Sequence, residues 1–254
     1  MLDEGTVNLT HTTADRGWIA HLEIDHARRR NAIGPAVIAA LQDRCAEISS
    51  DPNLRAVTLQ GAGGLFAAGA NVKVMAELDP ESARGFITSL HHAIDAVRRL
   101  PVPVIAVLQG HCYGAAMELA AACDMRIADT SLIAGMPEVR VGLPSVIEAC
   151  LLPRLIGWGR TSELLLTGRD VNALECRDIG FVERVAVAEK LQANLQDWLD
   201  AIMASAPGAV RAQKRVMQGW ERDLSAGIEA SIAAFAASFE TDEPRQYLPS
   251  ARGE

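Results

Sequence analysis

Two short segments of the chain share nearly the same letters and occur in the same context. The segments AVTLQG (56–61) and IAVLQG (105–110) lie 49 residues apart. Each is an apolar run that predicts a buried strand, each follows a helical pattern, and each leads into a loop rich in Gly and Ala. Strand-and-helix units repeated at this spacing predict parallel strands stacked beside one another, as in a short solenoid.

The rest of the pattern completes an α/β chain. The expected strands cover 6–11, 18–24, 54–59, 104–108 and 180–185, and the expected helices cover 35–49, 80–99, 114–123, 145–155 and 160–166. From residue 187 onward the sequence predicts three further helices, at 187–205, 207–220 and 224–239. We therefore expect a core in residues 1–186 and a C-terminal helical region in residues 187–254. We expect the helical region to pack on a neighbouring subunit.

Composition excludes several classes of protein. Hydrophobic residues make up 49% of the chain and charged residues 22%, as in globular proteins. A net charge of −8 argues against sequence-blind nucleic-acid binding, and no apolar run reaches membrane-span length. The start, MLDEGTVN, does not have the pattern of a signal peptide. The five cysteines are scattered and no CxxC occurs, so we expect no disulfide framework, no metal site and a cytoplasmic location.

Two glutamates occur in unusually apolar surroundings. Glu118 is the one charge in the helical pattern 114–123, and Glu138 stands between Pro137 and Val139. An ionised carboxylate without a partner is costly in such a setting, so the two together suggest general acid–base chemistry. Two structural alternatives stay open. Glu118 could reach solvent or pair with an arginine, and Glu138 could simply favour a helix N-terminus.

Three segments resemble the enoyl-CoA hydratase/isomerase, or crotonase, superfamily. They are FAAGANVK (66–73), GAAMELAAACD (114–124) and MPEVRVGLP (136–144), and the fuller pattern runs from RNA (30–32) to LTGRDVNALECRDIGFVERV (166–185). The resemblance implies a crotonase-like α/β fold of repeated ββα units, a short spiral of stacked parallel strands followed by a helical trimerisation region. It also implies a homotrimer or a hexamer, an acyl-CoA thioester as substrate, and no separate cofactor.

The resemblance also assigns roles to four residues. It implies that the amides of Ala70 and Ala115 form an oxyanion hole for the thioester oxygen. Small residues around both would let a ligand approach the backbone closely, although FAAGA could also be a tightly packed loop. The resemblance further implies that Glu118 helps to deprotonate the water that attacks C3 and that Glu138 gives a proton to C2. These are the roles in an enoyl-CoA hydratase, a hydro-lyase.

The binding site for coenzyme A is implied less sharply. The resemblance points to the loop before the first long helix and to the segments around the oxyanion alanines. The candidate residues are Arg28, Arg29, Arg30, Ala68, Asn71, Val72, Lys73 and Gly114. Arginine suits phosphate recognition, but a solvated basic loop is the alternative for each of the three arginines.

The chain departs from the family pattern at four places, one of which is the absence of the C-terminal Lys/Arg-bearing pattern that contributes to the coenzyme A phosphate site in many hydratases. Ala115 and Ala116 make the turn before Glu118 bulkier than usual, and Asn71 replaces the usual Asp. The segment PSVIEA replaces a Gly-rich loop and brings Ser145 and Glu148 toward the acyl pocket. Glu148 could be a third acid, but we favour a helix residue that faces water.

These departures leave other activities open. The enzymatic alternatives are an enoyl-CoA isomerase or a related acyl-CoA decarboxylase or hydrolase. The remaining alternative is a catalytically silent member that binds acyl-CoA or acts as a scaffold.

Overall fold

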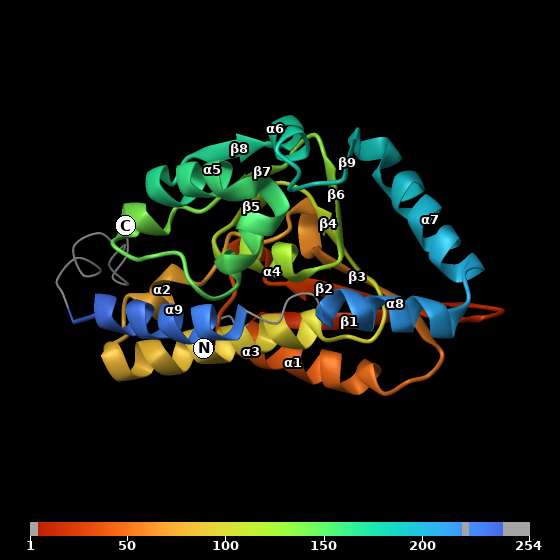
Figure 1. Cartoon of the computed structure of the whole chain (residues 1–254), viewed down its shortest axis with the longest axis horizontal. Helices are drawn as coiled ribbons and strands as arrows, with labels where there is room; N and C mark the ends of the chain where they lie inside the picture. Colours follow the sequence, from red (N-terminus) through yellow and green to blue (C-terminus); the bar gives the residue numbers. More distant parts are fainter. Residues whose placement is uncertain (1–4, 220–223, 241–254) are drawn as a thin grey trace.

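The computed structural model describes residues 5–219 and 224–240 (Figure 1). Its strands are β1 (Thr6–Ala14), β2 (Gly17–Asp25), β3 (Leu54–Gly61), β4 (Val104–Leu108), β5 (His111–Tyr113), β6 (Met125–Asp129), β7 (Ile133–Gly135), β8 (Asp170–Asn172) and β9 (Arg184–Ala186). A six-stranded sheet has the order β1-β2-β3-β4-β6-β9, and a three-stranded sheet has the order β5-β7-β8. Only the β1–β2 and β7–β8 pairs are antiparallel among these strands.

The helices connect and cover these strands. The α-helices are α1 (Pro35–Ser49), α2 (Val72–Met75), α3 (Pro80–Arg98), α4 (Ala115–Ala122), α5 (Leu152–Thr167), α6 (Ala173–Asp178), α7 (Ala188–Ala204), α8 (Pro207–Gly219) and α9 (Leu224–Ser238). The 3-10 helices are η1 (Ala27–Arg29), η2 (Ala62–Gly64), η3 (Glu138–Val141) and η4 (Ile147–Leu151). Within the described ranges, no helix combines the length and the apolar character needed to span a membrane.

The repeated strand endings lie side by side, as their sequence predicts. β3 and β4 are parallel neighbours, with Thr58 opposite Ile105. Aligning AVTLQG with IAVLQG would instead place Thr58 opposite Val107, so the observed register is displaced by two residues. Because side chains alternate along a strand, a shift of two keeps the same positions on the same face. The two Gly/Ala-rich loops that follow these strands therefore leave the sheet at the same edge.

Helices α3 and α1 cover one face of the large sheet. α3 starts with a capping box in which Asp79 and Ser82 bond reciprocally, and Pro80 follows the cap. Its apolar stripe, which includes Phe86 and Leu90, is buried in the main core. α9 runs beside α3 (Figure 1), so the C-terminal helical region contributes to the same core.

The other face of the large sheet is covered by α7. Leu191, Leu195 and Leu199 are spaced at helical intervals and pack on Ile105 and Ile127 of the central strands. The boundary that we predict at residue 187 falls just before this helix. It remains a prediction, and the ends of both predicted regions, residues 1–4 and 241–254, lie outside the described residues.

Several sequence-based bounds are wrong. The strand expected at 180–185 begins only at Arg184, because Gly180 adopts a φ of 88° in the preceding turn. The helix expected at 145–155 is instead η4 followed by the start of α5, and α5 itself is kinked at Gly157. The short strands β5, β7 and β8 and the strand β6 were not predicted.

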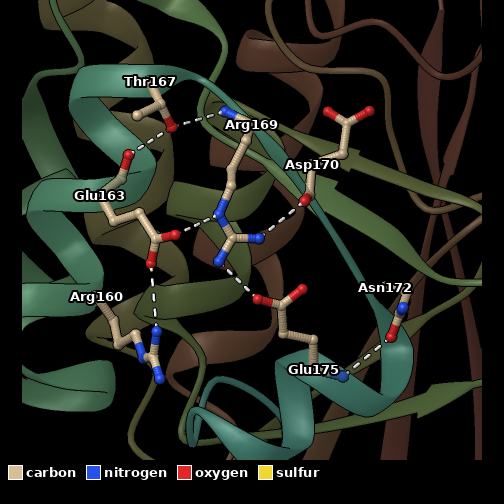
Figure 2. Close-up of polar contacts among 7 residues, drawn as sticks. All are labelled: Arg160, Glu163, Thr167, Arg169, Asp170, Asn172 and Glu175. Carbon is tan, nitrogen blue, oxygen red and sulfur yellow. Dashed lines mark hydrogen bonds and ion pairs between the residues drawn. The ribbon is translucent and has the colours of Figure 1, made fainter.

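A polar network around Arg169 holds the corner between α5, β8 and α6 (Figure 2). The guanidinium donates to Glu163 at 2.8 Å and to Glu175 at 2.6 Å, and Asn172 caps α6 through the Glu175 amide. β8 pairs with β7, which leads directly into the segment that carries Glu138. The network therefore supports the strand that leads into the segment of Glu138, one candidate catalytic residue.

Candidate active site

Two loops that follow the paired strands lie against each other and form the floor of the site. Phe66 N–H donates to the Gln109 carbonyl at 2.8 Å, and Ala67 N–H donates to the His111 carbonyl at 3.0 Å. Gly69 has a φ of 93°, and a Cβ at this position would lie only 2.6 Å from the Tyr113 carbonyl oxygen. Only glycine fits such a backbone conformation and such a close approach.

This packing brings the two predicted oxyanion residues to one pocket. Ala70 follows Gly69, and the position of a Cβ on Gly69 lies 3.9 Å from the Ala115 nitrogen. Ala115 is the first residue of α4, where backbone N–H groups have no partner within the helix. Among the described residues, neither the Ala70 nor the Ala115 amide has an acceptor. Both residues line the pocket, so both amides are available to a carbonyl oxygen there.

Glu118 lies on α4, a helix that is buried all round because most of its side chains are alanine. The residue is 3% exposed, and its Oε1 accepts a hydrogen bond of 3.3 Å from the Ala149 amide. Burial raises the pKa of Glu118 well above its ordinary value, and the nearby charges of Glu138 and Glu148 raise it further. The solvent-facing alternative for Glu118 is therefore wrong.

Glu138 is the first residue of η3, as the helix-terminus alternative requires, but its carboxylate also lines the pocket. Ser145 Oγ donates to its Oε2 at 2.8 Å. Burial raises the pKa of Glu138, and the Ser145 hydrogen bond opposes this by favouring the ionised form. Gly114 leaves the space for this carboxylate, because a Cβ there would lie 2.3 Å from Glu138 Oε1.

The pocket joins these groups to an apolar chamber. It has a volume of about 120 Å³. Its apolar walls come from α2 and α3, from η3 and the segment after it, and from α9. The wall residues are Val72, Met75, Phe86, Ile87, Leu90, Val141, Leu143, Pro144, Val146 and Phe235. Two carboxyl groups in one such pocket repel each other when both are ionised, so they favour holding one proton between them.

The predicted coenzyme A residues fall on two adjoining loops. The Ala68 amide donates to the Arg30 carbonyl at 2.9 Å, which joins the arginine loop to the loop that carries Ala70. Arg28, Arg29 and Arg30 are exposed, as are Val72 and Lys73, and Ala68, Val72 and Gly114 line the pocket. Asn71 caps α2 by accepting from the Lys73 amide at 3.1 Å. The replacement of the usual Asp by Asn therefore keeps a capping side chain.

The prediction for Glu148 is wrong. The residue is 1% exposed, and its Oε1 lies 2.7 Å from His91 Nδ1 on α3. The physical reason is that PSVIEA forms the tight turn η4 against α4 instead of a helix on the surface. Ile147 takes a φ of 38° in this turn, which directs the chain inward.

Sequence reasoning missed one contact and one wall residue of the site. Ser145 was placed near the pocket, but its hydrogen bond to Glu138 could not be read from the sequence. Phe235 of α9 also lines the pocket, although it lies far along the chain from the other lining residues, which end at Val146. The apolar stripe of that helix in the sequence indicated only that Phe235 is a packing residue, not that it lines the site.

Comparison with known proteins identifies the family of this chain. The family model described as enoyl-CoA hydratase/isomerase matches residues 15–250. The chain belongs to the enoyl-CoA hydratase/isomerase family. It is 32% identical to the enoyl-CoA isomerase/hydratase fer4 of Mycosarcoma maydis, over 93% of this chain and 90% of that protein. It is 33% identical to the putative enoyl-CoA hydratase/isomerase YngF of Bacillus subtilis, over 93% and 92%.

Solved structures of enoyl-CoA hydratase/isomerase relatives share the fold. An enoyl-CoA hydratase from Bacillus anthracis is 30% identical, with a TM-score of 0.79, and the match covers 97% of this chain and all of that one. An enoyl-CoA hydratase from Bacillus halodurans gives a TM-score of 0.86 at 20% identity, covering 94% and 98%. The crotonase-like α/β fold predicted from the sequence is thus confirmed.

Proposed function

We propose that this family member is an enoyl-CoA hydratase, which adds water to a trans-2-enoyl-CoA and gives a 3-hydroxyacyl-CoA. The observation that supports the proposal most strongly is the shared pocket of Glu118 and Glu138. Both carboxyl groups line it, both have a raised pKa, and both accept hydrogen bonds, Glu118 from the Ala149 amide and Glu138 from the Ser145 hydroxyl. Beside them stand the Ala70 and Ala115 amides, which have no acceptor in the part of the chain that the structure describes.

Each group has a step in this mechanism. The Ala70 and Ala115 amides hold the thioester oxygen and stabilise the negative charge that develops on it as the enolate forms. In the state in which the proton shared by the pair lies on Glu138, ionised Glu118 accepts a proton from the water that attacks C3. Protonated Glu138 gives a proton to C2, and proton exchange through the pocket then restores the starting state. The net change is one water added and no charge left on the enzyme.

The coenzyme A moiety would lie across the two loops outside the pocket. The exposed guanidinium groups of Arg28, Arg29 and Arg30 suit its phosphates, and Lys73 adds a further positive charge nearby. The backbone from Ala68 to Ala70 suits the pantetheine arm, because small side chains let the chain approach closely. The apolar walls then receive the acyl chain.

The test is hydration of a panel of trans-2-enoyl-CoA thioesters, followed by loss of the enoyl absorbance. We expect Glu118→Gln and Glu138→Gln each to lower kcat by about 10²-fold or more, within the range for loss of a general acid or base. Circular dichroism should show that both variants fold. Turnover like the wild type in either variant removes that residue from the mechanism.

An enoyl-CoA isomerase is the second candidate. The Mycosarcoma maydis relative is named both isomerase and hydratase, and moving a double bond needs proton transfer by only one carboxylate. Retained activity of Glu118→Gln on a 3-enoyl-CoA would favour isomerisation. Binding of coenzyme A thioesters without turnover on any substrate would instead favour a silent, binding member.

We also propose that the chain assembles as a homotrimer or a dimer of trimers. Trp158 and Leu166 of α5 are 76% and 78% exposed, and Val216 and Met217 of α8 are also exposed. Side chains of this kind become buried in subunit interfaces. Sedimentation velocity tests this assembly, and a monomer at micromolar concentration would contradict it. The cytoplasmic location stays a prediction, supported by five cysteines that are all free.

A further inference from the structure

A buried ion pair lies outside the proposed acid–base mechanism. His91 Nδ1 and Glu148 Oε1 are 2.7 Å apart, and their side chains are 17% and 1% exposed. The second carboxylate oxygen, Glu148 Oε2, is buried without a hydrogen-bond partner among the described residues. A buried carboxylate in this state is costly, so its retention calls for a role.

The pair joins two walls of the acyl pocket. His91 directly follows Leu90 on α3, and Leu90 and Ile87 line the pocket. Glu148 lies on η4, two residues after Val146, which lines the pocket from the other side. The ion pair therefore fixes the distance between the α3 wall and the η4 wall.

The η4 turn also holds the candidate base. The residue after Glu148 is Ala149, whose N–H is shared between the Val146 carbonyl at 2.9 Å and Glu118 Oε1 at 3.3 Å. On the other side of Glu148 stands Ile147, a β-branched residue with a φ of 38°. Such a conformation costs about 1–3 kcal/mol and persists only where surrounding contacts enforce it. A side-chain anchor next to this residue keeps the strained turn against α4.

The groups around the pair act on its charge in both directions. The Glu148 hydrogen bond raises the pKa of His91, whereas burial lowers it; Asp95 raises this pKa further and Arg99 lowers it. Burial raises the pKa of Glu148, whereas His91 and Arg98 lower it; the negative charge of Asp95 raises it further. On α4, Glu118 also faces Glu148. A proton held between His91 and Glu148 keeps the hydrogen bond in place.

We propose that the His91–Glu148 pair is a positioning unit for Glu118: it anchors η4 so that the Ala149 N–H holds the Glu118 carboxylate in its reactive orientation. The inference rests on the proposed hydratase function and extends it. Glu148 is not among the described residues that line the pocket, so it acts through Ala149 and does not touch the substrate.

The first experiment separates positioning from stability. His91→Leu leaves Glu148 buried without its partner, whereas the double variant His91→Leu/Glu148→Leu removes both polar groups and should fold more stably than the single variant. His91→Gln keeps an N–H donor toward Glu148. The matched control is His92→Leu, because His92 is the exposed neighbour on the same helix.

The expected result concerns kcat more than KM. We expect kcat for hydration to fall at least about tenfold in His91→Leu and to stay low in the double variant, with KM within about threefold of the wild type. His91→Gln should recover most of kcat, and His92→Leu should match the wild type. Recovery of kcat together with stability in the double variant would overturn the proposal, because the pair would then be only structural.

The second experiment does not need turnover. Hydrogen exchange at the Ala149 amide should be at least about tenfold faster in the double variant than in the wild type, while the amides of β3 stay equally protected. Unchanged protection at Ala149 would contradict the anchoring. A wild-type protein without hydratase activity would refute the proposed function, and the exchange measurement would still decide whether the pair anchors η4.

Discussion

Replacement of Gly114 by alanine gives the sharpest test of the active-site geometry. Gly114 has a φ of 51° and a ψ of −120°, and a Cβ there would lie 2.3 Å from Glu138 Oε1. Ordinary contacts of a Cβ begin near 3.4 Å, so the carboxylate must retreat by roughly 1 Å. A displacement of that size can cost a reaction about 10²-fold, or about 2.7 kcal/mol of transition-state stabilisation.

The same substitution strains the backbone. A side chain at positive φ costs about 1–3 kcal/mol, and for a chain of this size each kcal/mol lowers Tm by about 2–4 °C. We therefore expect Gly114→Ala to fold, with Tm lower by roughly 2–12 °C and with kcat lower by about 10²-fold. The assays are steady-state hydration of a short trans-2-enoyl-CoA and thermal unfolding followed by circular dichroism.

Gly85→Ala is the matched control. Gly85 is exposed in the interior of α3, and a Cβ there would meet nothing within 4 Å. Alanine should stabilise that helix by about 0.5–1 kcal/mol and leave kcat unchanged. If Gly114→Ala keeps kcat within about threefold of the wild type, Glu138 does not need the space that glycine provides, and our account of the site is refuted.

Two further substitutions test single contacts. Ser145→Ala removes the hydrogen bond that favours ionised Glu138, so the pKa of Glu138 should rise and the alkaline limb of the kcat profile should move to higher pH; an unchanged profile would exclude this contact. Lys214→Met breaks the buried ion pair between Lys214 Nζ of α8 and Asp124 Oδ2, which are 2.7 Å apart. The free energy of unfolding, measured with urea, should fall by about 2–3 kcal/mol. The control Arg215→Met, on the exposed side of α8, should change it by less than about 0.5 kcal/mol.

The sequence was most informative where local pattern and packing agree. The helix from Pro35 to Ser49 has the predicted bounds, because proline starts it and its apolar stripe faces the core. Glu118 stood out because every other residue of α4 is apolar. Burying a lone carboxylate in such a helix costs free energy, so its presence there indicates a functional pocket.

The strands and contacts that the sequence did not predict were missed for physical reasons. Strands β5, β7 and β8 are three residues long, which is too short to show a period of two. The inward turn of Glu148 depends on a positive φ at Ile147, a conformation that no propensity favours for a β-branched residue. Its partner, His91, comes from a helix more than fifty residues away, and a contact of this range leaves no local trace in the sequence.

The pocket is completed by Phe235, which lies on the last helix of the described chain. A nascent chain would therefore have both candidate carboxylates long before it had a finished acyl chamber. Docking of α9 and binding of a ligand in the chamber are thermodynamically linked, because the ligand can contact Phe235 only when α9 is docked. A saturating acyl thioester should thus slow proteolysis within residues 224–240 more than proteolysis at the distant β1–β2 hairpin.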